Sequence, residues 1–186
     1  MGNPPVPEFV LPRVPINGSI ALAEPDPRWP HQFSLVASRV LGVLGQRVIL
    51  LEHVGSTSVP RLPAKPILDV VLVVAAPTDE ATYVPPLGDI GFTLHLREPG
   101  WYEHRLLRGP DPKVNLHVFG PDAPEVRRML LFRDRLRDNP GERDLYASVK
   151  RELAARQWEY VQDYADAKSL VVQEILERAA RGARPT

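Results

Sequence analysis

The sequence contains no cysteine among its 186 residues. Disulfide bonds, thiolate nucleophiles and cysteine-bound metals are therefore excluded. No apolar run is long enough to cross a bilayer, and the proline-rich first residues lack the apolar core of a signal peptide. These absences predict a cytoplasmic protein with no membrane partner.

An excess of charge of one sign is also missing, because 23 basic residues balance 23 acidic ones. Overall charge therefore does not direct the protein toward nucleic acid, and we expect no nucleic-acid partner. Four common motifs are absent: GxxxxGK[ST], GxGxxG, GxSxG and HExxH. The sequence therefore indicates neither a P-loop nor a dinucleotide-binding site. It also indicates neither a serine hydrolase nor a zinc protease.

The chain length suits one domain. Prolines punctuate residues 1–16, which predicts a flexible N-terminal arm before a single domain at residues 17–180. The β-branched run at residues 68–75 predicts a central strand covered on both faces. Other strands are expected at residues 19–23, 47–54, 91–97, 102–107 and 114–119, and helices at 27–44, 79–87 and in most of the chain after residue 122. This order predicts an α+β fold, with helices against a mixed sheet.

A small-residue turn, Gly55-Ser56-Thr57-Ser58, follows the strand expected at residues 47–54. Glycine allows a backbone that points amides at a ligand, and hydroxyl side chains add donors. The turn is therefore a candidate phosphate-binding site. The alternative is a plain Gly-Ser turn with no ligand.

Asp69 lies thirteen residues beyond Ser56, at the start of the apolar strand. A carboxylate entering a buried strand must be paired, bound to metal or placed at the mouth of a cleft. Magnesium prefers carboxylates together with substrate phosphates, so Asp69 is a candidate catalytic metal ligand. Lys65 is the nearest cation and a candidate contact to phosphate oxygens. An ion pair or helix cap for Asp69, and a solvated loop position for Lys65, are the alternatives.

Two histidines lie near strand ends, and His53 and His117 with Asp69 would make a two-histidine, one-carboxylate metal site if the strands are neighbours. The metal would be Mg²⁺, Mn²⁺ or Zn²⁺. Glu52 and His53 point to opposite sides of their strand, so only one of them faces the cleft. Asn115 and His117 share a face that is expected to look toward Asp69. The alternative is that the histidines only pack against the sheet.

Other basic side chains are candidates for contacts to phosphates. Arg105 is assigned to the phosphate-binding set, and the further candidates are Arg108, Arg133 and Lys168. For each of them the alternative is an ordinary surface charge.

Four segments together closely resemble the GrpB family. The central one is EHVGSTSVP, from Glu52 to Pro60, continued by AKPILD from Ala64 to Asp69. The others are NLHV at residues 115–118, LFRDRLR at 131–137 and YADAK at 164–168. The likeness extends from about Ile20 to Glu177, which is nearly the whole chain.

The resemblance implies a nucleotidyltransferase-like fold, a mixed sheet flanked by helices with further helices at the C-terminal end. Active members of that superfamily carry a Gly-Ser turn and then a strand with an Asp-x-Asp/Glu pattern. With a third carboxylate, these residues hold two divalent metals. Gly55 and Ser56 match the turn and Asp69 matches the first carboxylate, but Val71 occupies the second position. The third position falls near Asn115 or His117.

Three functions remain open, of which the last in rank is a structural accessory domain that acts through its C-terminal helices. The first is transfer of a nucleoside monophosphate from a nucleoside triphosphate to a small molecule or protein. Ser56 would then bind phosphate, Asp69 a metal, and Lys65 the leaving pyrophosphate. The second is a non-catalytic module that binds a nucleotide or a coenzyme A-like ligand and has lost the two-metal site. The first two functions predict a phosphorylated small molecule as the partner.

Overall fold

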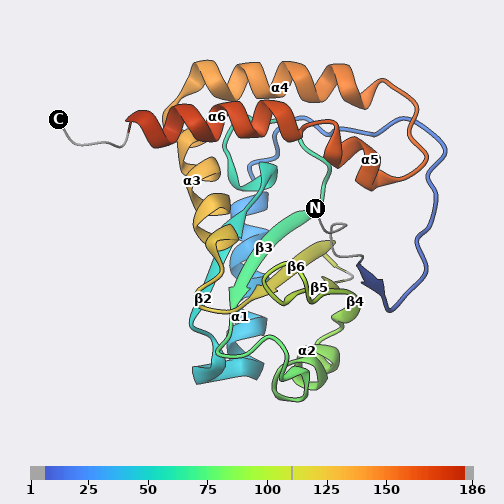
Figure 1. Cartoon of the computed structure of the whole chain (residues 1–186), viewed down its shortest axis with the longest axis vertical. Coiled ribbons are helices and arrows are strands. Elements are labelled where there is room, and N and C mark those ends of the chain that lie inside the picture. The colour runs from blue at the N-terminus through green and yellow to red at the C-terminus, as the bar shows by residue number, and fades with distance from the viewer. Residues whose placement is uncertain (1–6, 110, 183–186) are drawn as a thin grey trace.

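The computed structural model describes residues 7–109 and 111–182, which form an α+β fold around one six-stranded sheet (Figure 1). The strands are β1 (Glu8–Phe9), β2 (Leu50–Val54), β3 (Leu68–Val73), β4 (Thr93–Glu98), β5 (His104–Gly109) and β6 (Val114–Phe119). Their order across the sheet is β1-β4-β5-β6-β3-β2. Only β3 and β6 pair in parallel; the other neighbours are antiparallel. The predicted α+β class with a mixed sheet flanked by helices is confirmed.

The helices occupy both faces and one end of this sheet. They are α1 (Trp29–Leu44), α2 (Val84–Asp89), α3 (Pro124–Asp138), α4 (Pro140–Ala154), α5 (Val161–Asp166) and α6 (Ser169–Gly182). The helices α1 and α2 pack on one face and α3 on the other, while α4, α5 and α6 lie at the end of the sheet where β3 begins (Figure 1). In the part of the chain that the structure describes, no helix has the length and apolarity needed to cross a membrane.

β3 is the central strand that the β-branched run predicts. Val70 and Leu72 face α1 and α2 in the largest core cluster. Val71 and Val73 face α3 in a second cluster. Because both faces are covered, the strand is apolar at consecutive positions rather than at alternate ones.

The helical end of the molecule has its own core, in which Leu136 of α3, Tyr146 of α4 and Ile175 of α6 are all buried. Asn139 separates α3 from α4, and its side chain accepts a hydrogen bond from the Glu142 N–H at 3.0 Å. This N-cap, followed by Pro140 at the first helical position, explains the sharp break between the two helices. Val59 and Leu62 of the loop before β3 belong to the same core. The helices therefore pack directly on the loop that leads to Asp69.

Two expectations about the N-terminal part differ from the structure. The strand expected at residues 19–23 is absent: Gly18 and Ala23 make only isolated bridges, to Trp158 and Ala64. Within the expected flexible arm, residues 1–6 lie outside the described residues, whereas Glu8–Phe9 form β1 and pair with β4. These pairings involve partners distant in the sequence, which local patterns do not reveal.

The core packing yields a stability prediction. Leu116 in β6 is fully buried, and we expect Leu116→Ala to lower the free energy of unfolding by about 2–5 kcal/mol, since the cavity adds to the lost burial. Leu170→Ala on α6 is the control, because Leu170 is 70% exposed and should change stability by no more than about 0.5 kcal/mol. Urea denaturation measures both. Equal losses would contradict the assignment of β6 to the core.

Candidate functional site

The turn after β2 is shaped around the Asp69 carboxylate. Gly55 has a backbone φ of 65°, a conformation that residues other than glycine rarely adopt. A Cβ added to Gly55 would lie 2.4 Å from Oδ2 of Asp69. The carboxylate therefore rests against bare backbone, and two separate constraints require glycine at this position.

The predicted phosphate-binding residues of the turn divide into two groups. Thr57 and Ser58 are buried in the short 3₁₀ turn η2 (Ser56–Ser58). The Ser58 hydroxyl donates to the Gly55 carbonyl at 2.6 Å, and Thr57 Oγ1 lies 3.0 Å from Nε2 of His53. Both hydroxyls are thus used within the fold. Ser56 is only half-buried and its side chain neighbours Tyr146.

Two arginines of α3 hold this turn in place. Arg137 donates to the Ser58 carbonyl at 2.9 Å. Arg133 donates to the His53 carbonyl at 3.0 Å and to the Glu52 carboxylate at 2.7 Å. Arg133, one of the predicted phosphate contacts, is therefore occupied in fixing β2 and its turn.

Asp69 lies beside Asn115 in the parallel pairing of β3 with β6. The Asn115 amide donates to Oδ1 of Asp69 at 2.9 Å, and Nε2 of His117 lies 3.8 Å from the same oxygen. Burial raises the pKa of Asp69, but His117, Asn115 and the charge of Lys65 outweigh burial and hold the pKa below its ordinary value. The carboxylate is therefore ionised, and about a third of its side chain remains exposed.

Three lysines from separate elements lie close enough to this carboxylate for its charge to act on their pKa values: Lys65 in the loop before β3, Lys150 on α4, and Lys168 directly before α6. Burial lowers the pKa of all three, to about 7 for Lys150 and about 8 for Lys168. Repulsion from Lys65 lowers the pKa of Lys150 and of Lys168 further, Lys168 also lowers that of Lys150, and the charge of Asp69 raises the pKa of all three lysines. We call Lys65, Lys150 and Lys168 the lysine cluster.

Two tyrosines complete the surroundings of the lysine cluster. The Tyr164 ring lies 4.4 Å from Nζ of Lys168 and 6.0 Å from Nζ of Lys65, measured to the ring centroid. Burial raises the pKa of Tyr164 to about 12 and also raises that of Tyr146, so both hydroxyls are neutral donors. Among the described residues, the buried Tyr164 hydroxyl has no hydrogen-bond partner. The Tyr164 hydroxyl is therefore available to donate a hydrogen bond to a ligand.

The structure does not bring the predicted metal ligands together. His53 pairs with Val70, which directs its side chain to the α1 face, where it stacks on Phe33 at 4.8 Å. Burial lowers the pKa of His53 to about 4. Asp69 and His117 lie on the opposite face, so His53 does not join them. Within residues 7–109 and 111–182, no group of three His, Asp or Glu side chains has metal-binding geometry.

The two-metal carboxylate set that the family resemblance implies does not fit these residues either. Val71, at the second position, is fully buried against α3. Asn115, beside Asp69 in the neighbouring strand, offers an amide that already donates to that carboxylate. Of the three carboxylates that the family resemblance implies, Asp69 is therefore the one that these positions contain.

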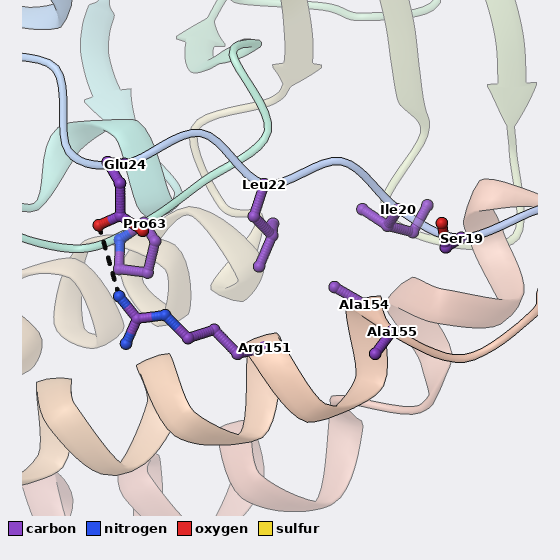
Figure 2. A pocket seen from close by; sticks show the side chains of 8 residues that line it. All are labelled: Ser19, Ile20, Leu22, Glu24, Pro63, Arg151, Ala154 and Ala155. Atoms are coloured by element: carbon purple, nitrogen blue, oxygen red, sulfur yellow. Dashed lines mark hydrogen bonds and ion pairs between the residues drawn. The ribbon is translucent and has the colours of Figure 1, made fainter.

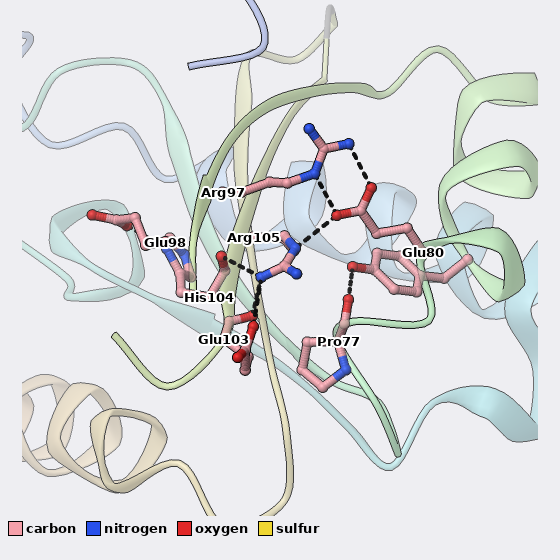
Figure 3. Close-up of polar contacts among 8 residues, drawn as sticks. Pro77, Glu80, Arg97, Glu98, Glu103, His104 and Arg105 are labelled. Atoms are coloured by element: carbon pink, nitrogen blue, oxygen red, sulfur yellow. Dashed lines mark hydrogen bonds and ion pairs between the residues drawn. The ribbon is translucent and has the colours of Figure 1, made fainter. Parts of the chain in front are cut away.

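Arg105 lies outside the site. Its side chain is on the α2 face of the sheet, where its Nε donates to Glu80 at 2.7 Å, and Glu80 also binds Arg97 (Figure 3). Arg105 pairs with Val118, whereas Asp69 shares its face with Asn115 and His117. The Arg105 side chain therefore belongs to an ion-pair group with Glu80 and Arg97, and it does not reach the Gly55–Ser56 turn.

A cavity of about 450 Å³ adjoins the lysine cluster. Tyr146 and Lys168 line it on the cluster side, and Trp101, Met129 and Phe132 supply an apolar wall. A second hollow of about 310 Å³ lies between residues 19–24 and α4, where Arg151 reaches Glu24 (Figure 2). None of the predicted site residues lines this second hollow, whereas Lys168 lines the first cavity and connects it to the candidate site.

Sequence analysis missed several of these residues. Lys150 lies among charged residues of a surface helix and gives no local signal of burial. Tyr146 and Tyr164 have the spacing of core residues. His104, which lies 3.1 Å from His117, and Glu98, which lies 2.7 Å from His104, belong to strands whose register the sequence does not specify. Lys168 and Tyr164 carried a further signal, because the YADAK segment to which both belong forms part of the family resemblance.

The comparison with known proteins agrees with the motifs. The family model described as GrpB protein matches residues 19–178. A UPF0157 protein of Halalkalibacterium halodurans is 57% identical over 165 residues, covering 89% of this chain and 85% of that protein. The crystal structure of conserved protein GrpB from Enterococcus faecalis superposes with a TM-score of 0.74 at 28% identity, covering 87% of this chain and 98% of that one.

A longer relative has an enzyme name. The dephospho-CoA kinase of Mycolicibacterium paratuberculosis is 28% identical over 163 residues, covering 74% of this chain. The match spans 40% of that enzyme, so most of the enzyme has no counterpart here.

The contact between Gly55 and Asp69 yields a testable prediction. Gly55→Ala should lower the free energy of unfolding by about 1–3 kcal/mol from backbone strain alone, and by more because its Cβ meets Asp69. Gly45→Ala is the matched control: Gly45 has a φ of 55°, but a Cβ there meets nothing within 4 Å. Chemical denaturation of both variants separates strain from contact. If the two losses are equal, Asp69 does not rest on Gly55.

Proposed function

The chain belongs to the GrpB family, and from this premise we propose that it binds the polyphosphate of a nucleotide or coenzyme A-like ligand between the Gly55–Ser56 turn and the lysine cluster. The bound phosphates would accept hydrogen bonds from Lys65, Lys150, Lys168 and the Tyr164 hydroxyl. The turn would supply the Ser56 hydroxyl.

The observation that supports this proposal most directly is an imbalance of charge. Other shielded cations in the molecule have their own carboxylates, as Arg105 has Glu80 and Arg133 has Glu52. The lysine cluster shares Asp69, and Asp166 acts on Lys168 alone. Lys150 is nearly fully buried, and among the residues that the structure describes its ammonium donates to the Pro63 carbonyl and faces the Tyr146 ring, with no carboxylate bound to it. Burying cations without a matching anion destabilises a fold. A bound polyphosphate would supply the missing negative charge.

The adjoining cavity suits the organic part of such a ligand. Its volume, about 450 Å³, lies in the usual range for small-molecule sites, which combine apolar walls with a few polar groups. Trp101, Met129 and Phe132 offer apolar contact, and Gln162 offers an amide. A nucleoside would place its base there with its phosphates at Lys168. The likeness to part of a dephospho-CoA kinase is the reason to include coenzyme A-like ligands.

A second candidate function is transfer of a nucleoside monophosphate from a nucleoside triphosphate to a small molecule or protein. It is favoured by Asp69 and His117, which lie together at the edge of the lysine cluster. Lys65 would hold the leaving pyrophosphate. Because Val71 and Asn115 replace the other carboxylates, no step through a two-metal centre is assigned to this chain.

Removal of one lysine tests the binding site. We expect Lys168→Met to weaken ADP binding about 10- to 100-fold, since a hydrogen bond to a charged group contributes about 1.5–3 kcal/mol. Isothermal titration calorimetry measures the change. The control is Arg47→Met, which removes the same charge from an exposed residue beyond the far end of α1. Equal weakening in both variants, or none in Lys168→Met, would contradict the proposed site.

The lowered lysine pKa values predict opposite pH trends for binding and stability. ADP affinity should fall as pH rises from about 7 to about 9, because Lys150 and Lys168, with pKa values of about 7 and about 8, lose their protons. Over the same range the ligand-free protein should become more stable, since the unfolded lysines bind more protons than the folded ones. Titration calorimetry and urea denaturation across this range test both trends. Parallel trends would contradict the assignment.

A further inference from the structure

Arg108 lies on the same face of the sheet as Asp69, two strands away. It pairs with Asn115 across β5 and β6, and Asn115 pairs with Asp69 across β6 and β3. Residues directly opposite each other on neighbouring strands point to the same face, and the hydrogen bond from Asn115 to Asp69 shows that this face is the one at the candidate site. The three side chains therefore form one row across the sheet, with the Cα atoms of Arg108 and Asp69 about 10 Å apart.

This row lies at the end of the sheet where α4, α5 and α6 are found, because β5 ends where β6 and β3 begin. On the same face, α3 packs further along the strands, over Val73 and Phe119. Arg108 is exposed and Asn115 is half-buried. A ligand held by the lysine cluster can therefore reach the Arg108 guanidinium.

Arg108 has no carboxylate partner among the residues that the structure describes. Burial is the one cause that shifts the pKa of Arg108, and it lowers that pKa, whereas the hydrogen bond to Glu80 raises the pKa of Arg97. Repulsion from Arg108 adds to the effect of burial in lowering the pKa of Lys65 and of His95. A partly shielded guanidinium beside another cation, with no anion of its own, indicates a place for an anionic ligand.

The cations of the site follow an order that begins at the cavity of about 450 Å³. Lys168 lines that cavity. The charge of Lys65 acts on Lys168, and the charge of Arg108 acts on Lys65 but not on Lys168. Because electrostatic influence falls with distance, Lys65 lies between the other two. Arg108 is therefore beyond Lys65 as seen from the cavity, on the sheet rather than on the helices.

We propose that Arg108 binds the terminal phosphate of a nucleoside triphosphate and makes the site select triphosphates over diphosphates. This rests on the binding function proposed above and names its substrate class. With the nucleoside in the cavity, the first phosphate lies at Lys168, the second at Lys65, and the third extends to Arg108. A guanidinium suits this position because it forms two parallel hydrogen bonds with phosphate oxygens. A coenzyme A-like ligand has no third phosphate in line and would leave Arg108 without an anion.

The unmodified chain provides the first test, by calorimetric titration of ATP and of ADP. EDTA is present in both titrations, so that no metal ion bridges the phosphates. ATP should bind at least about 10-fold more tightly than ADP, since charge-assisted hydrogen bonds are the strong ones in proteins. Equal affinities would overturn the selection of triphosphates even though ADP binds.

Substitution of Arg108 provides the second test. Arg108→Met should weaken ATP binding about 10-fold or more and change ADP binding by less than about twofold. Arg108→Lys, which keeps the charge but not the paired donors, should retain an intermediate preference for ATP. Arg47→Met, which removes the same charge from an exposed residue outside the site, should keep the full preference. Equal weakening of ATP and ADP in Arg108→Met would overturn the contact with the third phosphate.

Inorganic tripolyphosphate and pyrophosphate separate the phosphate contacts from those of the nucleoside. Tripolyphosphate should also bind more tightly than pyrophosphate, and Arg108→Met should remove that difference. Because Arg108 is exposed and unpaired among the described residues, Arg108→Met should be no less stable than the unmodified chain in urea. If neither nucleotide binds the unmodified chain, the binding proposal fails and the role of Arg108 fails with it. If ADP binds and ATP binds no more tightly, the role of Arg108 alone fails.

Discussion

The parallel pairing of β3 with β6 is the constraint on which the candidate site depends. Its register places Asp69 beside Asn115 and directs both side chains, with His117, to the face away from α1. Side chains alternate along a strand, so a shift of one residue would send Asp69 into the apolar core beneath α1. The covered faces of β3 make that shift costly, because Val70 and Leu72 would exchange places with Val71 and Val73. The same core that stabilises the sheet therefore positions the carboxylate.

The features that could be predicted from the sequence are those with a local cause. The β-branched run predicts β3, and alternation along residues 114–119 correctly predicts that Asn115 and His117 face Asp69. Alternation also predicts that only one of Glu52 and His53 faces the cleft. It does not say which one, because that depends on the register of β2 against β3. Pairing of His53 with Val70 decides the matter and removes His53 from the metal set.

The remainder of the site depends on tertiary packing. Lys150 and Lys168 come within range of the Asp69 charge because α3, α4 and α6 form a core with the loop around Val59 and Leu62. No spacing in the sequence connects residue 150 with residue 69. Such a cluster of shielded cations destabilises the fold, as functional sites often do, and the helical core around Tyr146 and Ile175 offsets that cost.

The strand β1, although it has only two residues, covers the edge of the sheet at β4. It pairs Glu8 with Arg97 and Phe9 with Leu96, and so occupies the outer side of β4. An uncovered β4 would present free backbone groups to the corresponding strand of another molecule, and exposed edges of this kind promote aggregation. Phe9 also meets the His95 ring at 6.1 Å, which fixes the short strand to its neighbour. Shortened versions of this protein intended for crystallisation or spectroscopy should therefore begin before Glu8 to remain monodisperse at high concentration.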